Sequence, residues 1–246
     1  MDQDFYREYS RIEDTHWWFR GRRAIFSRVL GEIQHDAERR ILDIGFGTGA
    51  MLGFLSSYGK VVGMDMSAEA VRFARTRTSQ PMLLGDIGAI PVRSQSVDLV
   101  TAFDIVEHVD DDAAALRELA RVCRPNGRIF LTVPAFQFLW GRQDTISHHR
   151  RRYTRRQLAT AVEAAGFRIL RINYFNTILF PVVAAIRIAR HLRSDPERDA
   201  HSDFTMTKPG LVNDVLARVL SAEAVLVTRL RLPAGVSLLC LAQRSS

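Results

Sequence analysis

Four aspartates follow short apolar runs at regular intervals in the first half of the chain. They are Asp43, Asp65, Asp86 and Asp104. Each lies at the end of a segment predicted as a β-strand, and the carboxyl ends of parallel strands meet at one edge of a sheet. Carboxylates there can accept hydrogen bonds from a ribose diol or an adenine amino group. The spacing therefore predicts a ligand site along this edge.

A glycine-rich turn follows the first of these strands. Within Asp43–Gly49, three glycines at alternate positions allow a tight turn and a close approach of the backbone to a ligand. Thr48 is predicted to cap the next helix, whose free N–H groups attract an anionic or polar group. The spacing Gly45-x-Gly47-x-x-Ala50 also fits a dinucleotide fingerprint. Taken alone, the turn is equally compatible with a structural bend that holds no ligand.

A second group of polar residues lies in a later loop that is rich in arginine. His148 and His149 titrate near neutral pH and can take a proton from an acceptor hydroxyl, and Tyr153 can orient that acceptor. These three residues are the candidate catalytic side chains. The alternative is that adjacent histidines in an arginine run form only a solvated basic face. Asp144, His148 and His149 lack the spacing of a metal site, so no metal is predicted.

The elements that position these residues alternate between strands and helices. Strands are predicted at 41–44, 60–65, 81–86, 96–104 and 128–134, with a turn at 124–127. Ser67 is predicted to start one helix, and Thr154 with Gln157 forms a capping box that starts another. This alternation favours an α/β fold with a doubly wound parallel sheet.

The first 38 residues are predicted to form one or two helices laid over the domain. Trp17, Trp18 and Phe19 are consecutive aromatics, followed by Arg22. One interpretation is a lid whose aromatic faces and Arg22 close over a ligand. The other is that these rings only pack the segment onto the core.

Composition bounds the remaining possibilities. With 246 residues, 47% hydrophobic and 25% charged, the chain is expected to form one domain over 1–246. Two distant cysteines give no disulfide framework, and Met1–Ser10 does not resemble a signal peptide, so a cytoplasmic location is expected. Most of the net charge of +7 falls between residues 142 and 171. Such a basic stretch suits phosphate, nucleic acid or an anionic membrane.

Residues 174–234 differ in character from the core. Residues 178–186 are apolar but too few to span a bilayer, Arg193–Gly210 is predicted as a linker, and 211–230 as an amphipathic helix. This insertion is expected to be a helical cap on the sheet. An apolar acceptor pocket or a peripheral contact with a membrane surface is the sharper hypothesis.

Somewhat under half of the chain, from about residue 39 to 133, resembles the S-adenosylmethionine (AdoMet)-binding core of a class I methyltransferase. The matching motifs are Leu42–Gly49, Gly63–Asp65, Gly85–Ile87, Val97–Val100, Val106–Val109 and Arg124–Arg128. The resemblance implies a Rossmann-like sheet of seven strands with the last antiparallel. In this scheme 167–173 is the sixth strand and 235–246 holds the seventh. The AdoMet-binding core is then 39–173, between the 1–38 lid and the 174–234 insertion.

The resemblance also implies which residues bind the cofactor. Gly45–Gly49 faces the amino-acid part of AdoMet, Asp65 holds the ribose, and Asp86 contacts the adenine. The implied cofactor-binding residues are Asp43, Gly45, Phe46, Gly47, Gly49, Asp65, Met66, Asp86, Ile87, Phe103, Asp104 and His108. Trp17, Trp18, Arg22 and Arg152 are expected on the acceptor or lid side.

The sequence thus predicts an AdoMet-dependent methyltransferase that modifies oxygen or nitrogen of a small-molecule or lipid-like acceptor, including one with phosphate or carboxylate. No DNA partner is expected, because Phe103–Val106 replaces the Asn-Pro-Pro-Tyr motif of nucleic-acid amino-group methylases. Three alternatives stay open. They are an RNA methyltransferase that uses the basic 148–156 stretch, an NAD- or nucleotide-binding Rossmann protein, and a fold relative that binds AdoMet without turning it over.

Overall fold

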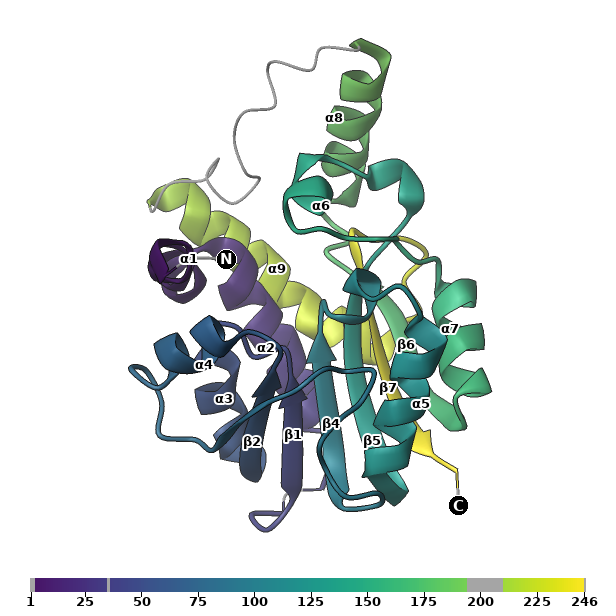
Figure 1. The fold of residues 1–246 in the computed structure, drawn as a ribbon. Helices are drawn as coiled ribbons and strands as arrows, with labels where there is room; N and C mark the ends of the chain where they lie inside the picture. Colours follow the sequence, from purple (N-terminus) through teal and green to yellow (C-terminus); the bar gives the residue numbers. More distant parts are fainter. Residues whose placement is uncertain (1–2, 35, 194–209, 246) are drawn as a thin grey trace.

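The computed structural model of the chain describes residues 3–34, 36–193 and 210–245. Within them, one sheet has the strand order β3-β2-β1-β4-β5-β7-β6, with helices on both faces (Figure 1). The strands are β1 Arg40–Ile44, β2 Lys60–Asp65, β3 Met82–Leu84, β4 Val97–Phe103, β5 Cys123–Pro134, β6 Phe167–Phe175 and β7 Ser237–Arg244. Only β7 runs antiparallel to its neighbours in this sheet of the described residues. The predicted seven-stranded α/β fold with an antiparallel last strand is therefore confirmed.

Helices connect and cover the strands. They are α1 Gln3–Thr15, α2 Trp17–Leu30, α3 Ala50–Leu55, α4 Ala68–Ala74, α5 Asp112–Val122, α6 Arg142–Ile146, α7 Arg155–Ala164, α8 Phe180–Arg193 and α9 Leu211–Arg229. Short 3₁₀ turns occur at Ser56–Tyr58, Val106–His108 and Gln137–Leu139. In Figure 1, α5 and α7 lie on one side of the sheet, and α2 and α9 cross the other side.

The predicted helix starts are right in two cases and wrong in one. The Ser67 side chain accepts a hydrogen bond from the Ala70 N–H at the start of α4, and Thr154 and Gln157 form the expected capping box at α7. Thr48 does not cap α3. The cap is Gly49, which has a φ of 84° and no side chain, while the Thr48 hydroxyl donates to the Glu13 carboxylate from α1.

The predicted turn at 124–127 falls inside β5. The pairing of β4 with β5 shifts register here, from Val97 opposite Cys123 to Leu99 opposite Arg128. Asn126 has a φ of 63°, in the left-handed region that asparagine tolerates. Five steps along β5 thus stand opposite two along β4, and Gly127 lies close to the Arg124 carbonyl oxygen, so the segment loops out within the strand as the predicted tight turn.

Aromatic side chains join α2 to the centre of the sheet. Phe26 of α2 stacks on Phe103 of β4 with ring centroids 4.4 Å apart, and both rings meet Phe130 of β5 edge to face at 5.2 Å. Such contacts add to the burial of apolar area. Because Phe103 is the last residue of β4, this packing fixes α2 over the carboxyl edge of the sheet.

The insertion before β7 contributes α8 and α9. Glu223 of α9 is fully buried and accepts hydrogen bonds from the N–H groups of Thr177 and Ile178, which lead into α8. Asn213 of α9 accepts from the Trp17 N–H and donates to the Thr15 carbonyl, at the junction of α1 and α2. No helix among the described residues is both long and apolar enough to cross a membrane. Of the predicted linker, residues 194–209 lie outside the described residues.

Candidate active site

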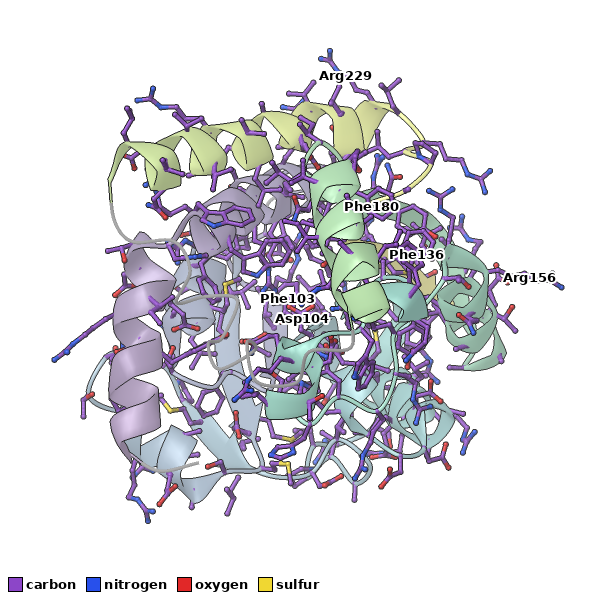
Figure 2. All side chains as sticks on the ribbon, turned by 90° about the horizontal axis from the view of Figure 1, so that it is seen from above. Phe103, Asp104, Phe136, Arg156, Phe180 and Arg229 are labelled. Atoms are coloured by element: carbon purple, nitrogen blue, oxygen red, sulfur yellow. The ribbon has the colours of Figure 1, made fainter. Side chains whose placement is uncertain are left out.

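The four predicted aspartates do lie along one edge of the sheet. Asp43 is near the end of β1, Asp65 ends β2, Asp86 follows β3 and Asp104 directly follows β4. Seen from above this edge, Phe103 and Asp104 lie near the centre, with α1, α6, α8 and α9 around them (Figure 2). The prediction that consecutive strand tips converge is confirmed as geometry.

The glycine turn depends on left-handed backbone conformations. Gly45, Gly47 and Gly49 have φ angles of 72°, 53° and 84°. A Cβ on Gly45 would come within 2.0 Å of the Ile105 side chain, whereas a Cβ on Gly47 would meet no atom within 4 Å among the described residues. Gly47 therefore faces open space on the side where a ligand would approach. Phe46 is 5% exposed and packs towards Gly63, so only its backbone is accessible.

Asp43 is a buried acid held by one hydroxyl. It is 2% exposed, and its Oδ1 accepts a hydrogen bond of 2.6 Å from Thr101 of β4. Burial raises the pKa of Asp43 to about 7, the Thr101 hydrogen bond opposes this rise, and the charge of Asp65 adds to it. The carboxyl thus changes its protonation near neutral pH.

The next two acids are tied to the backbone beside them. The Asp65 carboxylate accepts hydrogen bonds of 2.9 Å from the N–H groups of Gly47 and Ser67, which links β2 to the glycine turn. Met66 follows it with 75% of its surface exposed. Asp86 is exposed and accepts from the Gly88 N–H at 2.6 Å.

Ile87, also predicted to contact the cofactor, is 7% exposed. The positions of Asp65, Met66 and Ile87 agree with a polar contact to ribose and an apolar surface beside it. The role assigned to each residue stays a prediction.

The N-terminal helices bring charged residues to the same edge. Arg22 of α2 forms an ion pair of 2.7 Å with Asp104, and its guanidinium lies over the rings of Trp18 and Phe26. Trp17 and Trp18 are half-buried, and Trp18 stacks on Phe175 with centroids 5.8 Å apart. The two tryptophans therefore pack on the core while Arg22 reaches the site.

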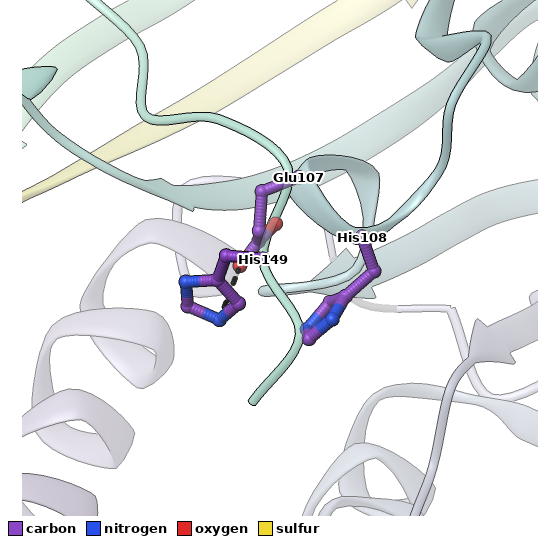
Figure 3. A group of neighbouring side chains, drawn as sticks. All are labelled: Glu107, His108 and His149. Carbon is purple, nitrogen blue, oxygen red and sulfur yellow. Dashed lines mark ion pairs between the residues drawn. The ribbon is translucent and has the colours of Figure 1, made fainter. Parts of the chain in front are cut away.

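A cluster of polar side chains lies next to Asp104. Glu107 and His108 are in the 3₁₀ turn after β4, and His149 comes from the loop after α6 (Figure 3). The rings of His108 and His149 are 4.6 Å apart, edge to face. His149 Nε2 is 3.9 Å from Glu107 Oε1. We call these three residues the Glu107 cluster.

Asp144 fixes the orientation of His149. Its Oδ1 lies 2.8 Å from His149 Nδ1, and Arg152 holds both of its carboxylate oxygens through Nε and a terminal nitrogen, at 2.8 and 2.9 Å. Burial by itself would raise the pKa of Asp144, but the hydrogen bonds from His149 and Arg152 lower it to about 2. An ionised carboxylate only accepts hydrogen bonds, so His149 Nδ1 is the donor. In neutral His149, Nε2 therefore carries the free lone pair.

Glu107 and His108 have unusual environments. Glu107 is fully buried, and neither of its carboxylate oxygens has a hydrogen-bond partner within the described part of the chain. Burial raises its pKa well above the ordinary value, and the charge of Asp104 adds to this effect. Burial lowers the pKa of His108 to about 4, and His149 acts in the same direction. His108 is therefore neutral at physiological pH.

The three predicted catalytic residues separate in the structure. His149 belongs to the Glu107 cluster, whereas His148 is exposed with a φ of 57°. The Tyr153 hydroxyl donates to Asp112 at 2.6 Å, and the side chain is buried. Arg152 donates to both carboxylate oxygens of Asp144, and its predicted contact with the acceptor stays a prediction. Sequence reasoning missed Glu107 and Asp144 as site residues, although each is close in sequence to a predicted histidine.

The residues at this edge fit the cofactor that the resemblance implies. Asp65 and the open face above Gly47 suit a ribose and the chain attached to it, and exposed Met66 suits the flat face of a base. A methyltransferase-domain family matches residues 42–131, which include the strand ends from β1 to β4. Residues 42–131 therefore match a methyltransferase domain, and the chain is similar to S-adenosylmethionine-dependent methyltransferases.

Curated relatives share part of the chain's length. A Streptomyces fradiae protein of a transposon, named only by its mass of 37.1 kDa, is 36% identical over 48% of this chain and 36% of its own. A Mycolicibacterium smegmatis protein named as a probable S-adenosylmethionine-dependent methyltransferase is 27% identical over 64% of this chain and 62% of its own. A Bordetella bronchiseptica ubiquinone biosynthesis O-methyltransferase is 28% identical over 54% and 61%. The chain thus spans less than two thirds of the length of each of these relatives.

Solved structures support the fold. One is a methyltransferase chain from the complex with the Haloferax volcanii Trm112 methyltransferase activator, with a TM-score of 0.64 and 19% identity over 100% of this chain and 98% of that chain. Another is phosphoethanolamine N-methyltransferase 2 of Haemonchus contortus in complex with S-adenosylmethionine, with a TM-score of 0.60 and 14% identity over 90% and 52%. At these identities the likeness establishes the shared fold alone.

Proposed function

We propose that the protein binds AdoMet at the carboxyl edge of its sheet and transfers the methyl group to oxygen or nitrogen of a small-molecule or lipid-like acceptor. The observation that carries this proposal is the placement of the glycine turn, Asp65 and Asp104 along one edge, with the Glu107 cluster beside Asp104. The methyltransferase-domain match over residues 42–131 supports the cofactor, and the geometry supports an acceptor site next to it.

The residues along this edge are proposed to contact different parts of AdoMet. Asp65 accepts hydrogen bonds from the ribose, the Gly47 N–H side of the turn lies against the amino-acid part, and Met66 covers the base. When bound, AdoMet supplies an electrophilic methyl group on a sulfonium centre. The protein contributes mainly position, which lowers the entropic part of the barrier.

The acceptor is proposed to meet the Glu107 cluster and an apolar wall. His149, oriented by Asp144, presents Nε2 to the ionisable group of the acceptor. Phe136 stacks on Tyr174 at 5.0 Å and lies 5.7 Å from Phe180 of α8, which provides aromatic surface for an apolar portion (Figure 2). Relatives named as O-methyltransferases, such as the Bordetella protein, favour oxygen as the methylated atom.

Direct binding of the product S-adenosylhomocysteine tests the cofactor site. We expect calorimetry to show binding to the full chain, and Asp65→Asn to weaken it roughly tenfold to a hundredfold, because hydrogen bonds to a charged acceptor contribute about 1.5–3 kcal/mol. Glu38→Gln is the matched control, since Glu38 is an exposed acid paired with Lys60 beside the opposite end of β2. Binding of NAD in preference to S-adenosylhomocysteine, or equal loss in both variants, would refute the proposal.

A further inference from the structure

We propose that the Glu107 cluster is a binding site for a divalent metal ion of the zinc type. Glu107, His108 and His149 each offer one ligand atom, and these atoms all lie within 4.8 Å of one another. The three side chains converge on one point from the turn after β4 and from the loop after α6 (Figure 3). No metal is predicted from the sequence alone, because His149 is far along the chain from Glu107 and His108 and the three residues share no local spacing.

The spacing of the donor atoms is compatible with one shared ion. Ligands at about 2.0–2.2 Å from a tetrahedral zinc are about 3.4 Å apart. His149 Nε2 and Glu107 Oε1 are 3.9 Å apart. Small side-chain rotations therefore bring these donors to a common ion without movement of the strands.

Glu107 supplies the second, independent observation. Its side chain is fully buried, and neither oxygen has a hydrogen-bond partner in the described ranges. A buried polar group without a partner costs about 1–3 kcal/mol. A cation between Glu107 and the two imidazoles would satisfy this carboxylate.

The surroundings of His149 match those of a metal-ligating histidine. Such a residue commonly donates its other ring N–H to a carboxylate, which fixes its tautomer and orientation. Asp144 accepts from His149 Nδ1 at 2.8 Å and is itself held by Arg152. Nε2, the remaining nitrogen, is the atom that faces Glu107.

The donor set indicates the kind of metal. Two imidazoles with one carboxylate suit zinc and similar transition metals better than magnesium or calcium, which prefer oxygen ligands. Three protein ligands leave a fourth position free, as in catalytic zinc sites. This step rests on the proposed function: the acceptor hydroxyl would take the fourth position on the ion. The ion would then lower the pKa of that hydroxyl, which makes its oxygen a better nucleophile.

Zinc binding to the full chain, prepared without a histidine tag, tests the inference. We expect calorimetry with zinc chloride to show about one bound ion, and affinity to fall at least roughly tenfold in Glu107→Gln and His149→Ala. His148→Ala is the matched control, because His148 is the adjacent, exposed histidine outside the cluster. Equal affinity in all variants, or no binding by the wild type, would overturn the proposal.

Cobalt(II) gives a second readout on the wild-type chain, so a variant that fails to fold leaves the test intact. Bound cobalt with the intense visible absorption of four- or five-coordinate geometry is expected, and the weak spectrum of the hydrated ion argues against the site. A chain that binds S-adenosylhomocysteine but no zinc contradicts only the metal site. A chain that binds zinc but not S-adenosylhomocysteine contradicts only the proposed function.

Discussion

Asp43 is a residue at this edge whose charge depends on the fold. It is buried beside Thr101, and its folded-state pKa of about 7 lies above the ordinary value of 3.8. Its charged form is therefore disfavoured in the folded chain relative to the unfolded chain. Because the carboxyl lies next to the glycine turn, this cost falls within the cofactor site itself.

This shift gives a stability profile with a defined sign. Below about pH 4, Asp43 is protonated in both the folded and the unfolded chain, and its contribution to stability is complete. That contribution is lost as pH rises through about 7, because the folded chain must then ionise a buried acid. Asp43→Asn should therefore gain stability relative to the wild type between pH 5 and 8, by up to a few kcal/mol. Urea unfolding of the ligand-free chain at both pH values measures the difference. A gap that stays constant with pH would show that Asp43 is not the group responsible.

The acids at the strand ends could be predicted from the sequence, but the contacts and burial of the side chains in and beside the Glu107 cluster could not. Asp65 and Asp104 follow apolar runs whose direction the pattern fixes. The contact of His149 with Asp144 depends on the loop conformation after α6, where His148 adopts a left-handed backbone. The burial of Glu107 depends on packing around a short turn. Neither feature has a periodic signal in sequence.

At the scale of elements, α1 and α2 are tied to the site by charged contacts. Glu13 of α1 accepts from Thr48 in the glycine turn and pairs with Arg77, while Arg22 of α2 pairs with Asp104. These contacts join the two helices to both halves of the edge. The interpretation of residues 1–38 as a lid is consistent with them, and it predicts that ligand exchange requires these contacts to break.

Arg22→Gln should therefore speed the exchange of S-adenosylhomocysteine. Arg22 and Asp104 are 12% and 28% exposed at the side chain, so their pair is less screened than a surface pair. We expect the dissociation rate of S-adenosylhomocysteine to rise about tenfold. Stopped-flow measurements of the fluorescence of Trp17 and Trp18 would give this rate. Arg20 lies on the same helix as Arg22 and forms an exposed pair with Asp214 of α9, so Arg20→Gln should change the rate less than about twofold. Matching rates for the two variants would rule out a gating role for Arg22.

The same long-range contacts explain where element predictions failed. The Thr48 cap was wrong because its hydroxyl binds Glu13, which is 35 residues earlier, and Gly49 takes the cap position. The strands, the Thr154 capping box and α9 depend on local patterns and were predictable. The turn at 124–127 was predictable as well, since it loops out between the paired residues Cys123 and Arg128 of β5.

At the scale of the whole molecule, the excess positive charge is largely neutralised within the fold. Among the arginines of the 142–171 stretch, four pair with acids: Arg150 with Asp110, Arg151 with Asp112, Arg152 with Asp144 and Arg171 with Glu32. Arg155 lies over the Tyr174 ring and donates to the Leu232 carbonyl. About half of the arginines in this stretch are therefore paired with acids of the same chain rather than being unpaired charges.

RNA binding should accordingly be weak and only slightly dependent on salt. A protein that neutralises many phosphates loses affinity steeply with salt, with a slope of about 0.7 per phosphate on single strands. Arg142 and Arg156 are exposed, so we expect a slope below about 2 for a labelled oligonucleotide between 50 and 200 mM salt, measured by fluorescence anisotropy. The double variant Arg142→Gln, Arg156→Gln should lower this salt-dependence slope further. Arg28→Gln on α2 is the control and should leave the slope unchanged. A slope of about 4 or more would mean that the internal pairs open to phosphate, and would make RNA the better acceptor.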